Sequence, residues 1–388
     1  MVNEMRKILI YIILIMLPID VTLGNIIGNA SLVSYVIILY MIISIFDILR
    51  NSWKIKKILS NKIILSSIGL LAITLITNAI LGNGIVIFNE NILFLCFLYM
   101  DEYTYQEKEI MKNSIIISLV IVILSIIYTS LILKYNIHGR ATIYLGTVAD
   151  PNYLAVGLNL IIVVLLEKCL DKKRIINYIL FIMGIIIVFA TGSRSGLLSI
   201  SISIILYLLL KNIKNIKNIK NIKNTIIIWS IFIVLICVLA INLIPDYVLQ
   251  RINIQSILQD GGSGRLEYWK IGFIFLIYNI TLFNVIFGFG YNSFSTLTKS
   301  ILGEYVGGHP HNSFIQVGFE FGIIAFIIFI YCIYENYKKI VNDKNILMIS
   351  VFSGLIISSI TLDMVLTRYF WIIIFLNSIG FGIKSVKN

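Results

Sequence analysis

Long apolar runs, separated by short polar segments, form the main pattern of this chain. Most runs hold about 17–25 residues, the length that an α-helix needs to cross the hydrocarbon core of a membrane. Because the runs are continuous, they do not fit the alternating strands of a membrane β-barrel. The pattern predicts about twelve transmembrane helices, at residues 8–24, 30–49, 62–81, 85–100, 113–134, 152–168, 175–191, 194–210, 225–244, 312–334, 345–362 and 368–383. We therefore expect an all-α polytopic membrane protein in which residues 1–388 form a single integral membrane domain.

The composition supports this class of protein. Hydrophobic residues make up 59% of the chain and charged residues only 13%, whereas the surface of a soluble domain must be partly polar. Arg6 and Lys7 precede the first apolar run, as in a signal sequence. No small-residue cleavage site follows them and further spans come after, so we expect an uncleaved first helix.

The basic residues predict how the helices are oriented. Cytoplasmic loops of membrane proteins carry an excess of Lys and Arg, which explains the net charge of +12 without a nucleic-acid partner. If both termini are cytoplasmic, 23 of the 31 basic residues lie on the inner side. The other eight are Lys134, Arg140, Arg194, Arg251, Arg265, Lys270, Lys299 and Arg368. This split favours two cytoplasmic termini and an extracytoplasmic loop at residues 245–311.

One apolar run in this loop leaves an alternative open. Residues 271–287 are apolar enough to form a thirteenth span, which would invert the later helices and place Lys338, Lys339 and Lys344 outside. Asn279 and Asn284 interrupt the run. We therefore favour a helix that lies at the membrane interface or re-enters part-way.

The residues that can carry chemistry gather on the predicted outer side. All three histidines, His138, His309 and His311, fall there. The spans hold few ionisable residues away from their ends, which argues against a proton or ion path through the bilayer centre. The pattern therefore favours a site at the outer membrane face.

Two short hairpins contribute to this face. In residues 135–152, Asp150 is suited to the N-cap of the next helix and Pro151 to its first turn, but Arg140 has no such structural explanation. In residues 191–196, Arg194 is either an anchor for its helix at the membrane surface or part of a phosphate site, since glycine and Ser193 flank it. A guanidinium beside free backbone N–H groups suits a phosphate.

A longer stretch, residues 261–322, contains the remaining candidates. Arg265 follows a glycine-rich segment and lies in the first turn of a predicted helix, where the helix N-terminus attracts anions. Tyr268, just after it, is either part of the site or an aromatic residue of the membrane interface. His311, close to neutral pKa, is a candidate general base or phosphate donor.

The rest of this stretch has weaker signals. His309 and His311 lack a carboxylate or cysteine at a suitable spacing, so we expect no metal. Asn312 leads into the next span, and Glu320, roughly two turns further on, suits a supporting or packing role better than direct contact. Gly318 and Gly322 form a pair of small residues that predicts close packing against another helix.

In this order along the chain, the motifs resemble the O-antigen polymerase and O-antigen ligase superfamily. The motifs are Thr-Gly-Ser-Arg at 191–194, Gly-Ser-Gly-Arg-Leu-Glu-Tyr-Trp at 262–269, Gly-Phe-Gly at 288–290, and His-Asn at 311–312 followed by Glu320 and Gly322. The resemblance covers residues 140–322. His309 has no clear counterpart in that family.

The resemblance implies a GT-C-like fold in a bacterial cytoplasmic membrane, with the active site outside the cytoplasm. It implies transfer of a glycan from a polyprenyl-pyrophosphate-linked oligosaccharide to an acceptor sugar, without a cofactor or metal. The essential residues of the family correspond to Arg194, Arg265 and His311, which we take as the catalytic candidates. We expect membrane lipid as a further partner. The sequence does not decide whether a chain-length regulator also binds.

Substrate binding and reaction type complete the expectation. We assign substrate contacts to Arg140, Ser193, Asn312, His309, Tyr268 and Glu320. Direct attack by the acceptor would invert the anomeric carbon, and no carboxylate suggests itself as a nucleophile for double displacement. We favour a polymerase of O-antigen or capsular repeat units. The alternatives are a ligase that transfers glycan to lipid A core, and a flippase or exporter of lipid-linked sugar, which would need charged residues in mid-membrane.

Overall fold

The computed structural model describes residues 2–23, 31–51, 53–81, 87–172, 174–214, 264–303 and 308–383. This part of the chain is helical and contains no strand, only two isolated bridges in residues 137–148. The all-α prediction is therefore confirmed. The first nine helices are α1 (Val2–Met16), α2 (Leu32–Arg50), α3 (Trp53–Ser60), α4 (Lys62–Ile80), α5 (Ile87–Tyr99), α6 (Tyr105–Ile127), α7 (Pro151–Lys172), α8 (Ile175–Ala190) and α9 (Arg194–Lys214).

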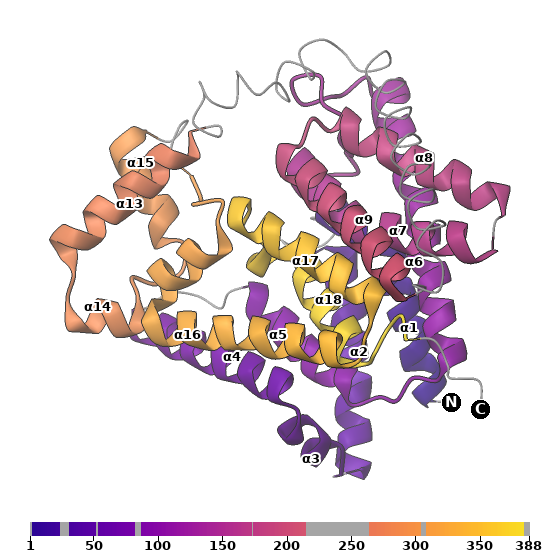
Figure 1. The fold of residues 1–388 in the computed structure, drawn as a ribbon. Coiled ribbons are helices and arrows are strands. Elements are labelled where there is room, and N and C mark those ends of the chain that lie inside the picture. Colours follow the sequence, from indigo (N-terminus) through magenta and orange to yellow (C-terminus); the bar gives the residue numbers. More distant parts are fainter. Residues whose placement is uncertain are drawn as a thin grey trace.

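The second half of the described chain begins with three short helices. These are α13 (Arg265–Asn279), α14 (Leu282–Phe287) and α15 (Ser293–Leu302), and they are followed by α16 (Ser313–Asn342), α17 (Ile346–Thr361) and α18 (Arg368–Ser378). In Figure 1, α13, α14 and α15 form a group at one side of the molecule, next to one end of α16. Short helical turns, η1 (Leu17–Leu23), η2 (Tyr128–Ile132) and η3 (Met364–Leu366), extend or join the longer helices.

Most predicted spans coincide with helices. Within the described residues, six helices are long and apolar enough to cross a membrane, and three shorter apolar helices lie at Glu90–Tyr99, Ile175–Ala190 and Ile346–Thr361. The predicted span at 225–244 lies outside the described residues, as does the segment 245–263 of the predicted loop. The chain is thus a multi-pass helical protein, and the number of twelve crossings stays a prediction.

The predicted interfacial segment is divided into two helices. α13 ends at Asn279, and the hydroxyl of Thr281 accepts a hydrogen bond from the N–H of Asn284 to cap the start of α14. Side chains that face away from the protein are apolar, with Phe273 67% and Leu282 78% exposed. Residues 271–287 therefore do not form one continuous span, as expected, and their outer face suits an apolar environment.

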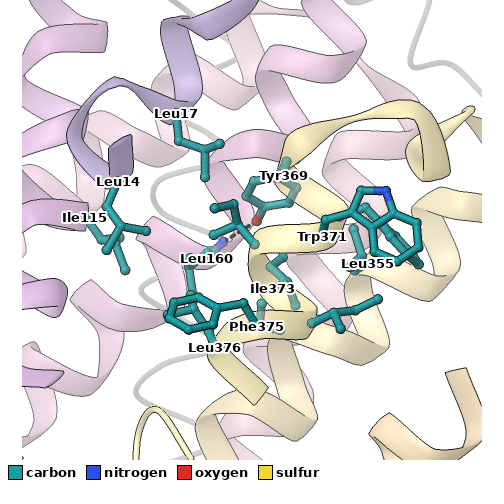
Figure 2. Close-up of a cluster of buried hydrophobic side chains, with 14 of the residues drawn as sticks. Leu14, Leu17, Ile115, Leu160, Leu355, Tyr369, Trp371, Ile373, Phe375 and Leu376 are labelled. Atoms are coloured by element: carbon teal, nitrogen blue, oxygen red, sulfur yellow. Dashed lines mark hydrogen bonds between the residues drawn. The ribbon is translucent and has the colours of Figure 1, made fainter. Parts of the chain in front are cut away.

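The core of the molecule surrounds α7 and α18. Residues 154–166 of α7 are almost all buried, as expected for a helix that is apolar on every side. Figure 2 shows the aliphatic and aromatic side chains that pack between these helices. There the hydroxyl of Tyr369 accepts a hydrogen bond from the N–H of Leu160 at 2.9 Å. The indole of Trp371 donates to the carbonyl of Val365 at 2.8 Å, which fixes the turn before α18.

Small residues bring α9 and α17 into close contact. Ser199 Oγ donates to the carbonyl of Gly354 at 2.8 Å, and Ser203 Oγ donates to the carbonyl of Ser350 at 2.9 Å. A Cβ at Gly354 would overlap the hydroxyl of Ser203. Helices in membranes associate through such small residues and through hydroxyl hydrogen bonds, because lipid provides little hydrophobic driving force.

α16 is broken near its start, and the break anchors the α13–α15 group. Gly322 has φ +79° and ψ −176°, a backbone conformation that is restricted to glycine. A Cβ there would overlap the carbonyl of Ile286, and a Cβ at Gly288 would overlap the carbonyl of Glu320. The N–H groups of Phe289 and Gly290 donate to the freed carbonyls of residues 319 and 320 at 3.0 and 2.8 Å. Two glycines thus let the two segments interlock.

This geometry corrects the packing predicted for Gly318 and Gly322. A Cβ at Gly318 would contact only Phe326 of the same helix, at 3.5 Å. Gly322 does make a close approach to another helix, at the end of α14, but through a helix break. The expected close packing therefore holds for Gly322 and is wrong for Gly318, because the spacing rule assumes an unbroken helix.

Ion pairs concentrate at the end of the bundle where α7 ends. Arg6 pairs with Asp47 and Asp101 at 2.7 and 2.8 Å. Near the end of α7, Lys112 pairs with Glu167 at 2.7 Å and Lys168 with Glu109 at 3.1 Å. α7 begins at the other end, beside Asp150. The two ends of the molecule therefore differ, and the residues described next lie at the end where α7 begins.

Candidate active site

The three catalytic candidates stand at or next to the first residues of three helices. Arg194 begins α9, Arg265 begins α13, and His311 lies just before α16. Burial lowers the pKa of Arg265, and the positive charge of Arg194 is close enough to lower it further. Arg265 in turn contributes to the lowered pKa of His311. The structure thus brings the three side chains, far apart in sequence, into one electrostatic neighbourhood.

Asp363 lies at the centre of this neighbourhood, in the turn between α17 and α18. It is 2% exposed, and its Oδ1 accepts the N–H of Asn312 at 2.9 Å. Its Oδ2 lies 3.5 Å from Nδ1 of His311. Burial raises the pKa of Asp363 to about 7, although the N–H groups of Asn312 and His311 and the charge of Arg265 oppose the rise. A carboxylate and an imidazole therefore face each other beside a guanidinium.

His311 has a constrained backbone and a neutral ring. Its φ is +48°, which is uncommon for a residue other than glycine. Burial lowers the pKa of His311 to about 4, and Arg265 adds to the effect. The imidazole is therefore uncharged at neutral pH and can accept a proton. Above pH 7 the Asp363–His311 pair consists of a carboxylate and a neutral ring.

Two further helices hold the segment that carries the histidines. Thr298 of α15 donates its hydroxyl to the carbonyl of Gly308 at 2.8 Å and accepts the N–H of Gly308 at 3.0 Å. Trp269 of α13 donates its indole N–H to the carbonyl of Pro310 at 2.6 Å. With Asp363 on its other side, the segment 308–312 is tied to three elements. Such multiple attachment keeps a strained backbone in place.

Arg140 connects the loop before α7 to the turn that carries Arg194. It is 6% exposed, its Nε donates to the carbonyl of Thr191 at 2.6 Å, and its Nη2 donates to Asn152 Oδ1 at 2.8 Å. The N–H of Ala141 also donates to the carbonyl of Ala190. The guanidinium thus binds groups of the protein on two sides, and this bracing role accounts for the arginine that the sequence left unexplained.

Ser193 and Asn312 cap the helices that begin at the site. Ser193 Oγ accepts the N–H of Gly196 at 3.1 Å, and Asn312 Oδ1 accepts the N–H groups of Phe314 and Ile315 at 2.9 and 3.1 Å. These bonds fix the helix starts, where the helix dipole is positive. The structure therefore gives both side chains a local partner.

Asp150 caps α7 as predicted, and it also adds charge to the site. Its Oδ1 accepts the N–H of Asn152 at 2.6 Å, and α7 begins at Pro151. The negative charge of Asp150 partly opposes the lowered pKa values of Arg265 and His311. Asp150 therefore balances positive charge at the site besides ending the loop.

Glu320 lies roughly two turns further along α16 than Asn312 and is fully buried. Gln316 Nε2 donates to Glu320 Oε2 at 3.4 Å, and the N–H groups of Asn292 and Phe294 also donate to this carboxylate. Glu320 thus holds the first turn of α15, the helix whose Thr298 binds Gly308. This placement agrees with the expected supporting role.

His309 and Tyr268 lie around the site, each half-buried. Burial lowers the pKa of His309, and its Nδ1 has no hydrogen-bond partner among the described residues. Tyr268 lies in the first turn of α13, one turn from Arg265. Within the described ranges, no group of three His, Cys, Asp or Glu side chains has the arrangement of a metal site.

Asp363 is the residue that the sequence analysis missed. It is the acidic residue in the short segment 362–367 between two predicted spans. The predicted orientation places this segment on the outer side, where three arginines had already been singled out. Those arginines were a signal for a partner carboxylate, because buried arginines need compensating charge.

One comparison with known proteins bears on this site. Residues 179–330 match a protein-family model described as O-Antigen ligase. The match covers under half of the chain and includes Arg194, Arg265, His311 and Glu320, while Arg140 and Asp363 lie outside it. No curated protein matches the chain. The match supports the resemblance to the O-antigen ligase and polymerase superfamily that the motifs indicated.

Proposed function

We propose that this protein is a membrane glycosyltransferase that polymerises polyprenyl-pyrophosphate-linked oligosaccharide repeat units. One observation carries the proposal: Arg194 and Arg265 share a neighbourhood with the neutral His311 and with Asp363. Positive charge and a proton acceptor in one place are what transfer from a pyrophosphate donor to a hydroxyl requires. The family match supports an activity of the ligase or polymerase type.

The arginines stabilise the leaving group. When the bond between the anomeric carbon and the pyrophosphate oxygen breaks, negative charge grows on the lipid pyrophosphate. Guanidinium groups fixed beside helix starts stabilise this charge without reorganising, and such preorganised stabilisation is usually the largest single contribution to catalysis. They supply the charge that a divalent ion would otherwise bring, so the proposed reaction needs no metal.

His311 and Asp363 act on the acceptor sugar. The acceptor hydroxyl attacks the anomeric carbon, its proton passes to His311, and the pair of electrons in the broken bond leaves with the pyrophosphate. Asp363, 3.5 Å from Nδ1 of His311, stabilises the imidazolium that forms. A single displacement of this kind inverts the anomeric carbon.

The location of the ion pairs supports an extracytoplasmic site. Lys112, Lys168 and Arg6 pair with carboxylates at the end of the bundle opposite to Asp150 and His311. Because cytoplasmic segments carry the excess of basic residues, we assign that end to the cytoplasm and the candidate site to the outer face. Both termini are then cytoplasmic, and the donor's sugar lies outside the cytoplasm.

Reconstitution with a defined lipid-linked repeat unit tests the proposal. A ladder of products would identify a polymerase, whereas product only after addition of lipid A core would identify a ligase. Arg194→Ala, Arg265→Ala and His311→Ala should each abolish product at normal protein levels. Full-length polymer from all three variants would refute the assignment of the site, and movement of the donor across the membrane without transfer would identify a flippase.

A further inference from the structure

An apolar groove lies directly beside the candidate site. It has a volume of about 620 Å³ and is walled by Trp269 and Phe273 of α13, Phe294 of α15, and Phe314 and Phe319 of α16. This volume is within the range of small-molecule sites in proteins, about 300–1,000 Å³. Lys270 supplies the charged group of the lining. Such a wall cannot satisfy the hydroxyl groups of a sugar, because buried polar groups need hydrogen-bond partners.

The groove and the site share residues and helices. Trp269 lines the groove and also donates its indole N–H to the carbonyl of Pro310, between the two histidines. Arg265 lies one helical turn before Trp269 on α13, and therefore on the same face. Phe314 lines the groove, and its N–H donates to Asn312 at the start of α16. The part of the candidate site that contains Arg265 thus continues into the apolar groove.

The outer wall of the groove suits contact with lipid. α13 presents Phe273, Ile277 and Tyr278 to the outside, at 67%, 62% and 82% exposure. A short helix with such a face lies most favourably at the boundary of headgroups and acyl chains. A ligand of the groove can therefore arrive from the membrane rather than from water.

We propose that the groove binds the part of the donor's polyprenyl chain next to the pyrophosphate. This inference rests on the proposed function and names the lipid side of the same site. The complementarity is that of an amphiphile: its anionic head meets Arg265 and Arg194, and its apolar chain lies along α13. From Trp269 to Leu276 the groove follows α13 for about 10 Å, so it holds the first isoprene units and leaves the rest of the chain in the bilayer.

Gly318 offers the point at which the groove can be filled. A Cβ there would make only an ordinary contact with Phe326, at 3.5 Å. At Gly272, by contrast, a Cβ would overlap the ring of Phe294. Gly318→Leu therefore extends into the groove without an overlap at its Cβ, and Ile315→Trp enlarges a second residue of the lining. Ile327→Trp is a matched control on the same helix, because Ile327 is 60% exposed and does not line the groove.

Two donors that differ in lipid length give the kinetic test. Both carry the same glycan and pyrophosphate, one on a full-length polyprenyl chain and one on a chain of two isoprene units. In Gly318→Leu and Ile315→Trp, KM for the long-chain donor should rise about tenfold. The difference in KM between the long-chain and the short-chain donor should therefore become smaller or disappear. Ile327→Trp should match the unchanged protein. An unchanged preference for the long chain in folded groove variants would overturn the proposal.

Photolabelling separates this inference from the proposed function. A photoreactive polyprenyl pyrophosphate without sugar should label residues 265–279 or 313–319, and Gly318→Leu should lose this label. Labelling confined to other helices, or labelling that phosphatidylglycerol removes as well as unlabelled polyprenyl pyrophosphate does, would overturn the groove assignment. Labelling of the groove in a protein that transfers no glycan would uphold the lipid site and refute the glycosyltransferase.

Discussion

Asp363→Asn removes one negative charge from the centre of the site and keeps the size of the side chain. The amide oxygen can still accept the N–H of Asn312, now bound by Oδ1 at 2.9 Å. What disappears is the carboxylate whose Oδ2 faces Nδ1 of His311 at 3.5 Å. The change therefore separates the structural role of Asp363 from its role as a charge.

The stability effect follows from the pKa of Asp363, which burial raises from 3.8 to about 7. A carboxyl group with a raised pKa is more stable protonated in the folded protein. At 1.36 kcal/mol per pKa unit, ionisation in the fold costs on the order of 4 kcal/mol. This cost develops as the pH rises through the interval from the unfolded to the folded pKa and is constant above about pH 7. Asparagine avoids it.

The expected result is a variant that is more stable and less active. The Tm of Asp363→Asn should exceed that of the unchanged protein at pH 8, and the difference should shrink at pH 5. Arg265 loses a neighbouring charge in the variant, so the gain should be smaller than the full cost of ionisation. Thermal unfolding of the purified protein at both pH values measures this difference.

Activity should change in the opposite direction. Opposite charges about 4 Å apart attract by a few kcal/mol at a partly solvated site, so loss of the carboxylate that stabilises the imidazolium should lower kcat/KM at least tenfold. In the unchanged protein kcat/KM should rise with pH to a plateau above about 7, as Asp363 ionises. In the variant this rise should be absent. Equal pH profiles, or a Tm difference that does not depend on pH, would refute the reasoning.

Three further predictions test other parts of the site. Arg265→Lys should lower transfer at least tenfold, since lysine lacks the planar fork that binds a pyrophosphate at two points, and transfer rates with saturating donor would show it. Arg140 holds the turn that carries Arg194 through two hydrogen bonds, to Thr191 and Asn152. Arg140→Lys should lose one of them and lower kcat/KM roughly tenfold to a hundredfold. An unchanged kcat/KM would contradict the bracing role. Gly322→Ala should cost on the order of 3 kcal/mol of stability, because of its φ of +79° and because a Cβ there would overlap the carbonyl of Ile286. Gly318→Ala should have a mild effect, and thermal unfolding of the two variants compares them.

The helices and the clustering of arginines were predictable because each has a local cause. Apolar runs of membrane-spanning length gave helices near the expected positions, and Asp150 and Pro151 marked the start of α7. Arg194 and Arg265 were recognisable as candidates since an arginine beside glycine, serine and a helix start suits a phosphate, although an anchor at the membrane surface was the alternative for Arg194. These signals need no knowledge of which helices are neighbours.

The partners across the site were not predictable in this way. Asp363 meets His311 because the start of α16 packs against the turn between α17 and α18. Nothing in the sequence of residues 362–367 identifies that neighbour. The break at Gly322 likewise depends on Gly288, a residue of another segment whose own φ is +75°. Long-range register of this kind comes from packing, so a spacing rule applied to residues 318–322 gave the wrong geometry.

The low pKa of His311 makes it a weak base, and the charge of a bound donor would raise this pKa. A base with a pKa of about 4 drives proton transfer poorly near neutral pH. A pyrophosphate bound at Arg265 brings negative charge next to His311 and offsets the guanidinium that depresses its pKa, so the pKa of His311 must rise when the donor is present. His311 would thus act as an effective general base only when the donor is bound. In Asp363→Asn, which lacks the rise caused by Asp363, the acid limb of kcat reports His311 with the substrates bound and should accordingly lie at higher pH than that of kcat/KM. Coincident limbs in the two profiles would mean that the donor's charge does not reach His311.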